Sequence, residues 1–372
     1  MVLMRRLGRP LPLRIAVVRM LRGLGDMLCI VPALRALRVA LPKAHITLVG
    51  FPSAHAFVAR FSHYVDELAE CPGYPGIPER QPDIQRLPEF FSFMHERSFD
   101  LAIQMHGNGV VTNPFTIMLN ARMNAGFFKP GQYCPDEKHF LPYPENEPEI
   151  RRYVRLLEFL GVPSAGEALE FPLWKNDRQE LSIMPETRDL WPRGYVCIHP
   201  GAHDPSRCWP AERFALVADA LSDFDLRVVL TGSAGERGLT RRVAKAMRRP
   251  SIDLAGRTTI GALAVLLSNA RLLVCNDTGI SHIAAALHIP SVVVFTNSDP
   301  GRWAPLNISL HRAVAASNGS LASGGFSFRG GKGADGSQSL RRAAQEPIPG
   351  IEQVLTAAED LLVKEKFYWQ GE

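Results

Sequence analysis

The sequence has no apolar run of about 18 residues, the length that a transmembrane helix requires. Its first 14 residues carry four arginines and two prolines but no apolar segment, so they do not resemble a secretory signal. Its 6 cysteines are scattered and form no CxxC pair, which is typical of reduced thiols and not of a disulfide framework. We therefore expect a cytoplasmic protein without a membrane-spanning helix.

The sequence also lacks a strong charge of either sign. Its 42 Lys and Arg residues exceed its 37 acidic residues by 5, a surplus that favours anionic ligands. This surplus is too small to be the basic footprint of a nucleic-acid-binding protein, so we expect no nucleic-acid partner. With 46% hydrophobic residues and 372 residues in all, the chain suits two globular domains.

Short apolar segments alternate with helical stretches in both halves of the chain. Strands are expected at residues 14–19, 45–49, 99–104, 195–199, 226–231, 272–275 and 291–295. Helices are expected at residues 27–41, 149–160, 211–221, 260–267 and 280–288. This alternation predicts an α/β protein with parallel sheets, built from two Rossmann-like halves with a cleft between them.

Composition divides the chain further. The stretch between the halves loses its periodicity and contains prolines, whereas a later stretch is dominated by glycine and serine, which is typical of disorder. We expect an N-terminal domain at 1–172, a linker at 173–194, a C-terminal domain at 195–314, a disordered insertion at 315–346 and a C-terminal helix within 347–372.

The motif Cys275-Asn276-Asp277-Thr278-Gly279-Ile280-Ser281-His282 joins an expected strand to an alanine-rich helix. Asp277, Thr278 and Gly279 offer the chemistry of a helix N-cap, and the backbone N–H groups of a first helical turn attract anions. His282 falls in that turn, where its ring can lean towards a ligand. The motif lies at the carboxyl end of a parallel strand, where such sheets bind ligands.

The stretch Gly23-Leu24-Gly25-Asp26 nearly matches the GxGxxG pattern of dinucleotide-binding dehydrogenases. Leu28 replaces the third glycine, no acid follows the second strand, and Asp26 would aim a carboxylate at the pyrophosphate, so the match fails. Asp26 can instead act as a base that takes a proton from a hydroxyl group. Capping of the following helix is the alternative role for Asp26.

Two further loops follow strands of the second half. In the first, Gly201 permits close approach, Ser206 can donate a hydrogen bond and Arg207 can clamp a phosphate. In the second, Glu236 can hold ribose hydroxyls or stabilise the start of its own helix. In the first half, the polar loop that contains His106 and Asn108 follows the strand at 99–104.

Neither of two candidate metal motifs fits a metal site. His199, His203 and Cys208 lack a fourth ligand and the spacing of a zinc site. The acidic sequence at 223–225 resembles the DxD metal motif of some glycosyltransferases, but it precedes a strand and so lies at the edge opposite the cleft. We expect a turn there.

Some aromatic and basic residues have two interpretations, one of which is contact with a membrane. Arginines near the start, Phe90, Phe91 and Phe93, and the sequence at 127–129 are compatible with peripheral contact with an anionic membrane surface. Solvated arginines and phenylalanines of the core explain them equally well.

Together, these motifs resemble glycosyltransferase family 9, the heptosyltransferases of lipopolysaccharide core assembly. The resemblance spans residues 14–310 with its motifs in the right order. It rests on Gly25-Asp26 before Pro32-Ala33-Leu34, on Pro200-Gly201 with Arg207 and Trp209-Pro210, on Asp277-Thr278-Gly279 with His282 and Ala284-Ala285-Ala286, and on Asp299-Pro300 with Trp303 and Pro305.

The resemblance implies a GT-B fold, two Rossmann-like domains that face each other across a cleft. It implies inverting, metal-independent transfer of heptose from a nucleotide sugar, usually ADP-heptose, to a saccharide or glycolipid acceptor such as lipopolysaccharide core. It implies no cofactor, and a place in the cytoplasm or peripherally at the inner face of the cell membrane. One departure is Arg207, where the family more often has lysine.

Roles follow for individual residues. Asp26 matches the family's base. The expected donor-binding residues are Gly201, Ser206, Arg207, Glu236, Asp277, Thr278, Gly279 and His282, and the expected acceptor-side residues are Gly25, His106 and Asn108. We expect Asp277 to cap its helix or accept sugar hydroxyls, without touching the phosphates. A catalytically inactive nucleotide-sugar-binding protein that serves as an assembly partner is the alternative function.

Overall fold

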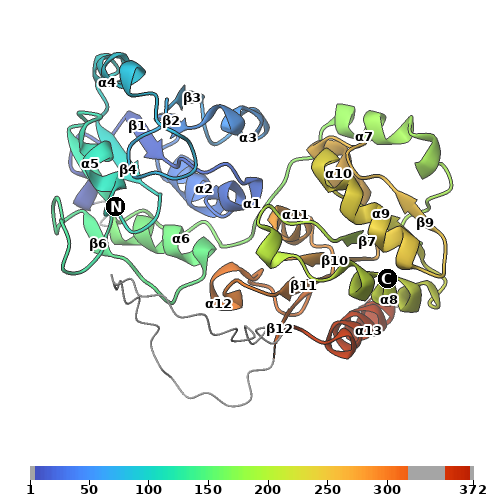
Figure 1. Ribbon diagram of the computed structural model, residues 1–372. Helices are drawn as coiled ribbons and strands as arrows, with labels where there is room; N and C mark the ends of the chain where they lie inside the picture. Colours follow the sequence, from blue (N-terminus) through green and yellow to red (C-terminus); the bar gives the residue numbers. More distant parts are fainter. Residues whose placement is uncertain (1–4, 317–347, 369–372) are drawn as a thin grey trace, which may run out of the picture.

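The computed structural model describes residues 5–316 and 348–368, and within them the chain forms two six-stranded parallel sheets with helices on their faces (Figure 1). The strand order is β3-β2-β1-β4-β5-β6 in the first sheet and β12-β11-β10-β7-β8-β9 in the second. Each order is that of a doubly wound sheet, which confirms the predicted α/β class. The expected insertion at 315–346 lies almost wholly outside the described residues.

The first sheet is built from the N-terminal part of the chain. Its strands are β1 (Arg14–Val18), β2 (His45–Gly50), β3 (Glu67–Glu70), β4 (Leu101–Gln104), β5 (Met123–Phe128) and β6 (Phe140–Pro142). Its helices are α1 (Leu24–Leu28), α2 (Val31–Ala40), α3 (His55–Arg60), α4 (Leu87–Glu96), α5 (Thr112–Ile117) and α6 (Glu149–Phe159).

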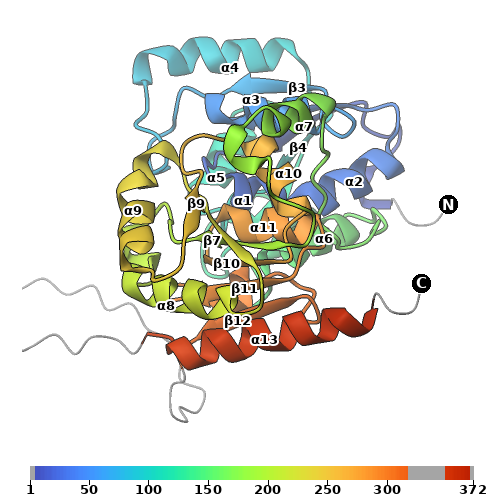
Figure 2. The ribbon, with the colours of Figure 1, turned by 90° about the vertical axis from the view of Figure 1, so that its right-hand side faces the viewer.

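The second sheet follows helix α7 (Lys175–Ser182). Its strands are β7 (Tyr195–His199), β8 (Arg227–Leu230), β9 (Ser251–Asp253), β10 (Leu272–Asn276), β11 (Ser291–Phe295) and β12 (His311–Ala315). Its helices are α8 (Ala211–Ser222), α9 (Arg237–Ala246), α10 (Ile260–Ser268), α11 (Gly279–Ala286), α12 (Pro300–Trp303) and α13 (Ile351–Tyr368). Helix α13 lies along the outer side of β12 and β11 (Figure 2).

The central strands form because their residues are mostly apolar, with several β-branched side chains among them. All five residues of β7, β10 and β11 are buried, as expected where helices cover both faces of a parallel sheet. These strands therefore place the residues that follow them at one edge of each sheet. None of the described helices is long and apolar enough to cross a membrane.

One expectation about local structure was wrong. The helix expected at 27–41 is two helices, because α1 ends at Leu28 and α2 starts anew with Pro32 in its first turn, where a missing N–H costs nothing. The stretch expected as the linker, 173–194, contains α7. This helix is polar, and it is held by a buried ion pair between Asp177 and Arg60 of α3 (2.7 Å).

The sequence at 223–225 forms the expected turn between α8 and β8. Asp225 has a positive φ of 58°, which aspartate tolerates better than most residues. Asp223 pairs with Arg249 at the amino edge of the sheet (2.9 Å). These acids are therefore remote from the carboxyl ends of the strands.

Candidate active site

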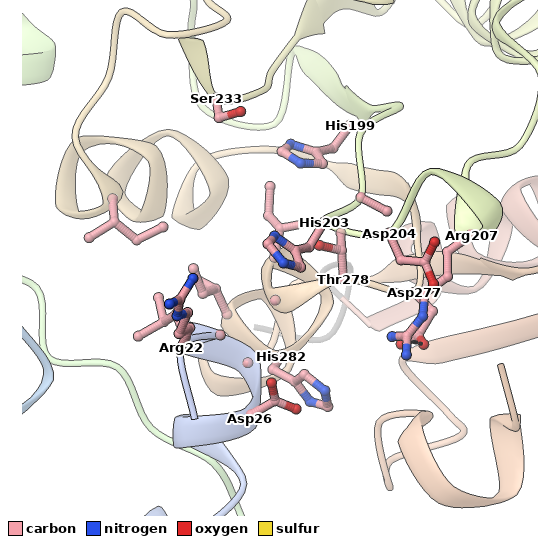
Figure 3. Close-up of a pocket in the computed structure, with 18 of the residues that line it drawn as sticks. Arg22, Asp26, His199, His203, Asp204, Arg207, Ser233, Asp277, Thr278 and His282 are labelled. Atoms are coloured by element: carbon pink, nitrogen blue, oxygen red, sulfur yellow. Dashed lines mark hydrogen bonds and ion pairs between the residues drawn. The ribbon is translucent and has the colours of Figure 1, made fainter. Parts of the chain in front are cut away.

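A pocket of about 980 Å³ lies between the two halves of the molecule, and loops at the carboxyl ends of the strands line it (Figure 3). The first half contributes residues 21–26, which follow β1, together with Pro78 and Glu79. The second half contributes parts of the loops after β7, β8, β9 and β10, with Trp303. Its size and place are those of a small-molecule site in a doubly wound protein.

Two glycines allow the halves to touch beside the pocket. A Cβ atom on Gly25 of α1 would lie 2.7 Å from the Cα atom of Gly279 in α11 and 2.9 Å from Cδ2 of His282. Contacts that short do not occur, so a side chain at Gly25 would separate the two helices. Gly25, expected on the acceptor side, lines the pocket and also forms this close contact.

Asp26 lies next to His282 at this junction (Figure 3). Its main-chain oxygen accepts a hydrogen bond from Nη2 of the buried Arg19 (2.6 Å), and a Cβ atom on Gly23 would come within 2.5 Å of Oδ2 of Asp26. Burial raises the pKa of Asp26 above its usual value of 3.8, while Arg19 and His282 oppose that shift. The carboxylate is thus a stronger base than an exposed aspartate.

His282 stands in the first turn of α11 with 3% of its surface exposed. Among the described residues no group hydrogen-bonds to its buried Nδ1 atom. Burial lowers its pKa, and Asp26 opposes the shift. The ring therefore favours its neutral form, with one nitrogen left for a ligand.

Asp277 and Arg207 form an ion pair on another side of the pocket, with Oδ2 of the acid 3.2 Å from Nη1 of the arginine. Burial raises the pKa of Asp277, and Ser298 and Arg207 oppose the shift. The buried Nε atom of Arg207 has no hydrogen-bond partner among the described residues, so this guanidinium retains a free donor.

The expectation that Asp277 caps α11 was wrong. The N-cap is Thr278, and no side chain makes a capping hydrogen bond there. Asp277 continues the β10–β11 ladder, its N–H donating to the Val294 oxygen (3.1 Å), so its carboxylate meets Arg207 instead. Thr278 and Gly279 line the pocket beside it.

Of the other expected donor-side residues, only Glu236 lines the pocket. It accepts the Ser233 N–H (2.6 Å) in a capping box, which is the helix-stabilising alternative for this acid. The carboxylate also lies against Gly201, where a Cβ atom would come within 2.0 Å of it. Ser206 does not line the pocket, and its hydroxyl accepts a hydrogen bond from Asn297 (3.0 Å).

The two remaining acceptor-side residues do not line the pocket. Nδ1 of His106 accepts the Met20 N–H (3.1 Å), and burial, with Arg19 adding to it, lowers the pKa of His106 to about 4. The Asn108 side chain accepts the Val110 N–H within its own loop (3.2 Å). Both side chains shape the loop after β4.

The structure adds residues that sequence reasoning missed. Arg22, Pro78, Glu79, Thr258 and Thr259 line the pocket. Thr259 carried a usable signal, an N-cap threonine before the apolar run of α10, and it does cap Ala262 (3.2 Å). Glu79 carried none, because it lies in a proline-rich stretch without periodicity.

The zinc candidates do not assemble. Nδ1 of His199 is 3.0 Å from the Thr231 hydroxyl, and burial lowers the pKa of this histidine. Among residues 5–316 and 348–368, no three His, Cys, Asp or Glu side chains are grouped to hold a metal ion.

The model of glycosyltransferase family 9 (heptosyltransferase) matches residues 89–322, more than half of the chain. The chain belongs to this family. Its amino-acid sequence is 25% identical over 296 residues to lipopolysaccharide heptosyltransferase 3 of Escherichia coli, with 76% of this chain and 83% of the relative aligned. It is 31% identical over 168 residues to lipopolysaccharide heptosyltransferase 2 of Salmonella typhimurium, which covers 42% of this chain and 48% of the relative.

Solved structures of the family share the fold. A family 9 glycosyltransferase from Veillonella parvula superposes with a TM-score of 0.72 at 23% identity, over 94% of this chain and 97% of that one. The E. coli ADP-heptose lps heptosyltransferase II gives a TM-score of 0.68 at 20% identity, over 95% and 99%. The GT-B fold expected for the family is therefore present.

Proposed function

We propose that this glycosyltransferase moves heptose from ADP-heptose to a hydroxyl of a saccharide or glycolipid acceptor such as lipopolysaccharide core, with inversion and without a metal ion. The observation that carries the proposal is the position of Asp26, a half-buried carboxylate of raised pKa at the junction of the two halves. Membership of the family and the similarity to a lipopolysaccharide heptosyltransferase supply the substrates.

Asp26 serves as the general base in this proposal. The acceptor hydroxyl gives its proton to the Asp26 carboxylate while its oxygen bonds to the anomeric carbon of the donor. On the opposite face of that carbon, the bond to the phosphate oxygen breaks and its electron pair leaves with ADP. Attack and departure on opposite faces invert the anomeric centre.

The charge of the leaving diphosphate needs a fixed positive charge and fixed hydrogen-bond donors. Arg207 offers its unpartnered Nε atom, the first turn of α11 at Thr278 and Gly279 offers backbone N–H groups, and His282 offers Nδ1. Asp277 holds the Arg207 guanidinium in place (3.2 Å), which is a positioning role and involves no direct contact with phosphate.

The two halves divide the substrates. We assign the nucleotide sugar to the second sheet, with Glu236 directed to ribose hydroxyls, and Gly201 and Ser206 shaping the loop that carries Arg207. We assign the acceptor to the first half, beside Gly25 and the loop shaped by His106 and Asn108. The domain limits 1–172 and 195–314 and a cytoplasmic location with peripheral contact at the inner face of the membrane belong to the same proposal.

A donor screen tests this function. The purified protein is offered ADP-, GDP-, UDP- and TDP-sugars with a heptose-deficient lipopolysaccharide acceptor, nucleotide release is measured, and NMR gives the anomeric configuration of the product. We expect release with ADP-heptose and a configuration opposite to that of the donor. Retention would refute inversion, and calorimetric binding of nucleotide sugars without turnover would favour the inactive assembly partner.

Metal independence has its own arm in that screen. Turnover should persist at its full rate after treatment with EDTA, because the groups around Arg207 meet the diphosphate charge. A loss that Mg²⁺ restores would contradict this part of the proposal.

A further inference from the structure

A buried ion cluster centred on Glu149, the first residue of α6, lies beside the junction. This carboxylate is 3% exposed. Its Oε2 atom accepts hydrogen bonds from Nη1 of Arg152 (2.5 Å) and Nε of Arg302 (3.0 Å), and Oε1 accepts one from the Tyr153 hydroxyl (2.5 Å). Nη1 of Arg19 lies 3.5 Å from Oε1. Three guanidinium groups thus converge on one carboxylate.

The cluster connects the two halves of the molecule. Glu149, Arg19 and Arg152 belong to the first half, whereas Arg302 comes from α12 of the second half, which extends towards α6 (Figure 1). Although burial acts to raise it, Arg19 and Arg302 hold the pKa of Glu149 down to about 2. The acid is therefore charged at neutral pH and attracts Arg302 whenever the halves meet.

One member of the cluster also holds the segment that carries the base. Nη2 of Arg19 donates to the main-chain oxygen of Asp26 (2.6 Å), and its Nη1 donates to the Met105 oxygen (2.8 Å). Arg19 is wholly buried. Arg19 therefore connects Glu149 with the backbone of α1.

Arg302 also lies close to the pocket. Its guanidinium carbon stands 4.7 Å from the centroid of the neighbouring Trp303 ring, and Trp303 lines the pocket. The contacts therefore run from the pocket wall of the second half, through Arg302, Glu149 and Arg19, to Asp26 in the first half.

We propose that Arg302 is a positioning residue that, acting through Glu149 and Arg19, sets the place of Asp26 when the two halves are docked. The inference rests on the proposed role of Asp26 as base. Arg302 does not touch the reacting atoms; it fixes the carboxylate that aligns Arg19. Because a displacement of about 1 Å at a reacting group costs about 100-fold in rate, loss of this contact should slow turnover.

A purely structural role for Arg302 would predict that its replacement lowers the stability of the fold. The Arg302 side chain is 35% exposed, so its replacement removes no wholly buried group from the core. If Arg302 is replaced, Glu149 keeps Arg152, Arg19 and Tyr153 as partners, so no buried charge is left alone. A protein without Arg302 should therefore still fold, and its only defect should be a lower rate of turnover.

The test uses R302A and R302K in the full chain, with R312A as the matched control. Arg312 makes a similar half-buried ion pair with Asp360 (2.7 Å), but within the second half. Turnover is measured with ADP-heptose and the lipopolysaccharide acceptor, and ADP affinity by calorimetry. R302A should lower kcat about 30- to 100-fold with donor KM and ADP affinity within about twofold of wild type. R302K should recover about tenfold, since it restores the charge, and R312A should match wild type.

Three outcomes overturn the inference: R302A turnover within about threefold of wild type, an equal loss in R312A, or a loss of ADP affinity that accounts for the defect. Amide hydrogen exchange at residues 24–28 provides a readout that needs no substrate. Faster exchange in R302A and not in R312A supports the inference even if wild type does not turn over ADP-heptose, a result that would refute the proposed function alone. Unchanged exchange in both variants overturns the inference itself.

Discussion

At the scale of single residues, two carboxylates of raised pKa line the pocket, Asp26 and Asp277, and they differ in the side chains next to them. Asp26 has His282 beside it and Arg19 behind its backbone, so its carboxylate is free to take a proton. Asp277 is committed to Arg207. This difference in environment is why the proposed mechanism gives base chemistry to the first acid and positioning to the second.

The raised pKa of Asp26 predicts the acid limb of the pH profile. The base works only when ionised, so kcat/KM should fall tenfold per pH unit below the pKa of Asp26, which lies above 3.8. Steady-state rates measured from about pH 3 to 8 test this. An acid limb that begins only below pH 3.8 would contradict a raised pKa for the catalytic base.

Arg207 should act on the donor more than on the fold. R207A removes the guanidinium that binds the diphosphate and leaves Asp277 without its cation. We therefore expect kcat/KM to fall about 100-fold, through a higher KM for the nucleotide sugar or a lower kcat. R207K keeps the charge but not the planar fork and should lose less, about tenfold. An equal loss of kcat/KM in R207A and R207K would mean that the positive charge of residue 207 contributes nothing to binding of the diphosphate without the guanidinium.

At the scale of elements, α1 and α11 are the parts that bring the halves together. Their contact depends on Gly25 and Gly279, where backbone meets backbone without a side chain between. The first turn of each helix thus contributes to one site, Asp26 from α1 and His282 from α11.

The glycine contact predicts opposite outcomes for two substitutions. G25A places a Cβ atom 2.7 Å from the Cα atom of Gly279, so it should destabilise by about 1–3 kcal/mol and lower kcat at least tenfold. G238A is the control: nothing lies within 4 Å of its new Cβ atom in α9, and it should stabilise by about 0.5–1 kcal/mol. Thermal unfolding and turnover measure both, and a G25A protein with wild-type stability and rate would refute the close contact.

The elements show how far the sequence could predict this structure. The central strands were predicted because runs such as 272–275 and 292–295 are apolar throughout, and the residues after them fall at one sheet edge. The short polar α7 was not, since its one buried residue is Asp177, which pairs with Arg60, and no apolar face marks the helix in the sequence. The Asp277–Arg207 pair joins residues 70 positions apart, which no local pattern reveals.

At the scale of the whole molecule, the two halves face each other across a pocket and are linked by an ion pair between charged side chains. The Glu149 cluster belongs to neither half alone, since Arg302 completes it from the other side. The Glu149 carboxylate stays ionised among three arginines, so its ion pairs stabilise the contact between the two halves. Protonation of Glu149 at low pH would remove this contribution.

Acid should therefore weaken the molecule through Glu149. Its pKa in the folded protein, about 2, lies below the ordinary 4.5, so its contribution to stability is full above pH 4.5 and is lost as the pH falls towards 2. E149Q should destabilise by about 3–5 kcal/mol at pH 7, with the difference shrinking below pH 4.5. Urea unfolding at pH 7 and pH 3.5 measures this, and a difference that does not depend on pH would contradict it.

Replacement of the base by its neutral isostere tests the central claim most directly. D26N keeps the shape of Asp26 and removes its proton affinity, so turnover of ADP-heptose should fall by about 10²–10⁴-fold with ADP affinity unchanged. Because burial raises the pKa of Asp26, its charge opposes folding above that pKa, and D26N should be at least as stable as wild type at pH 7. A stable D26N protein that transfers heptose at the wild-type rate would contradict the account.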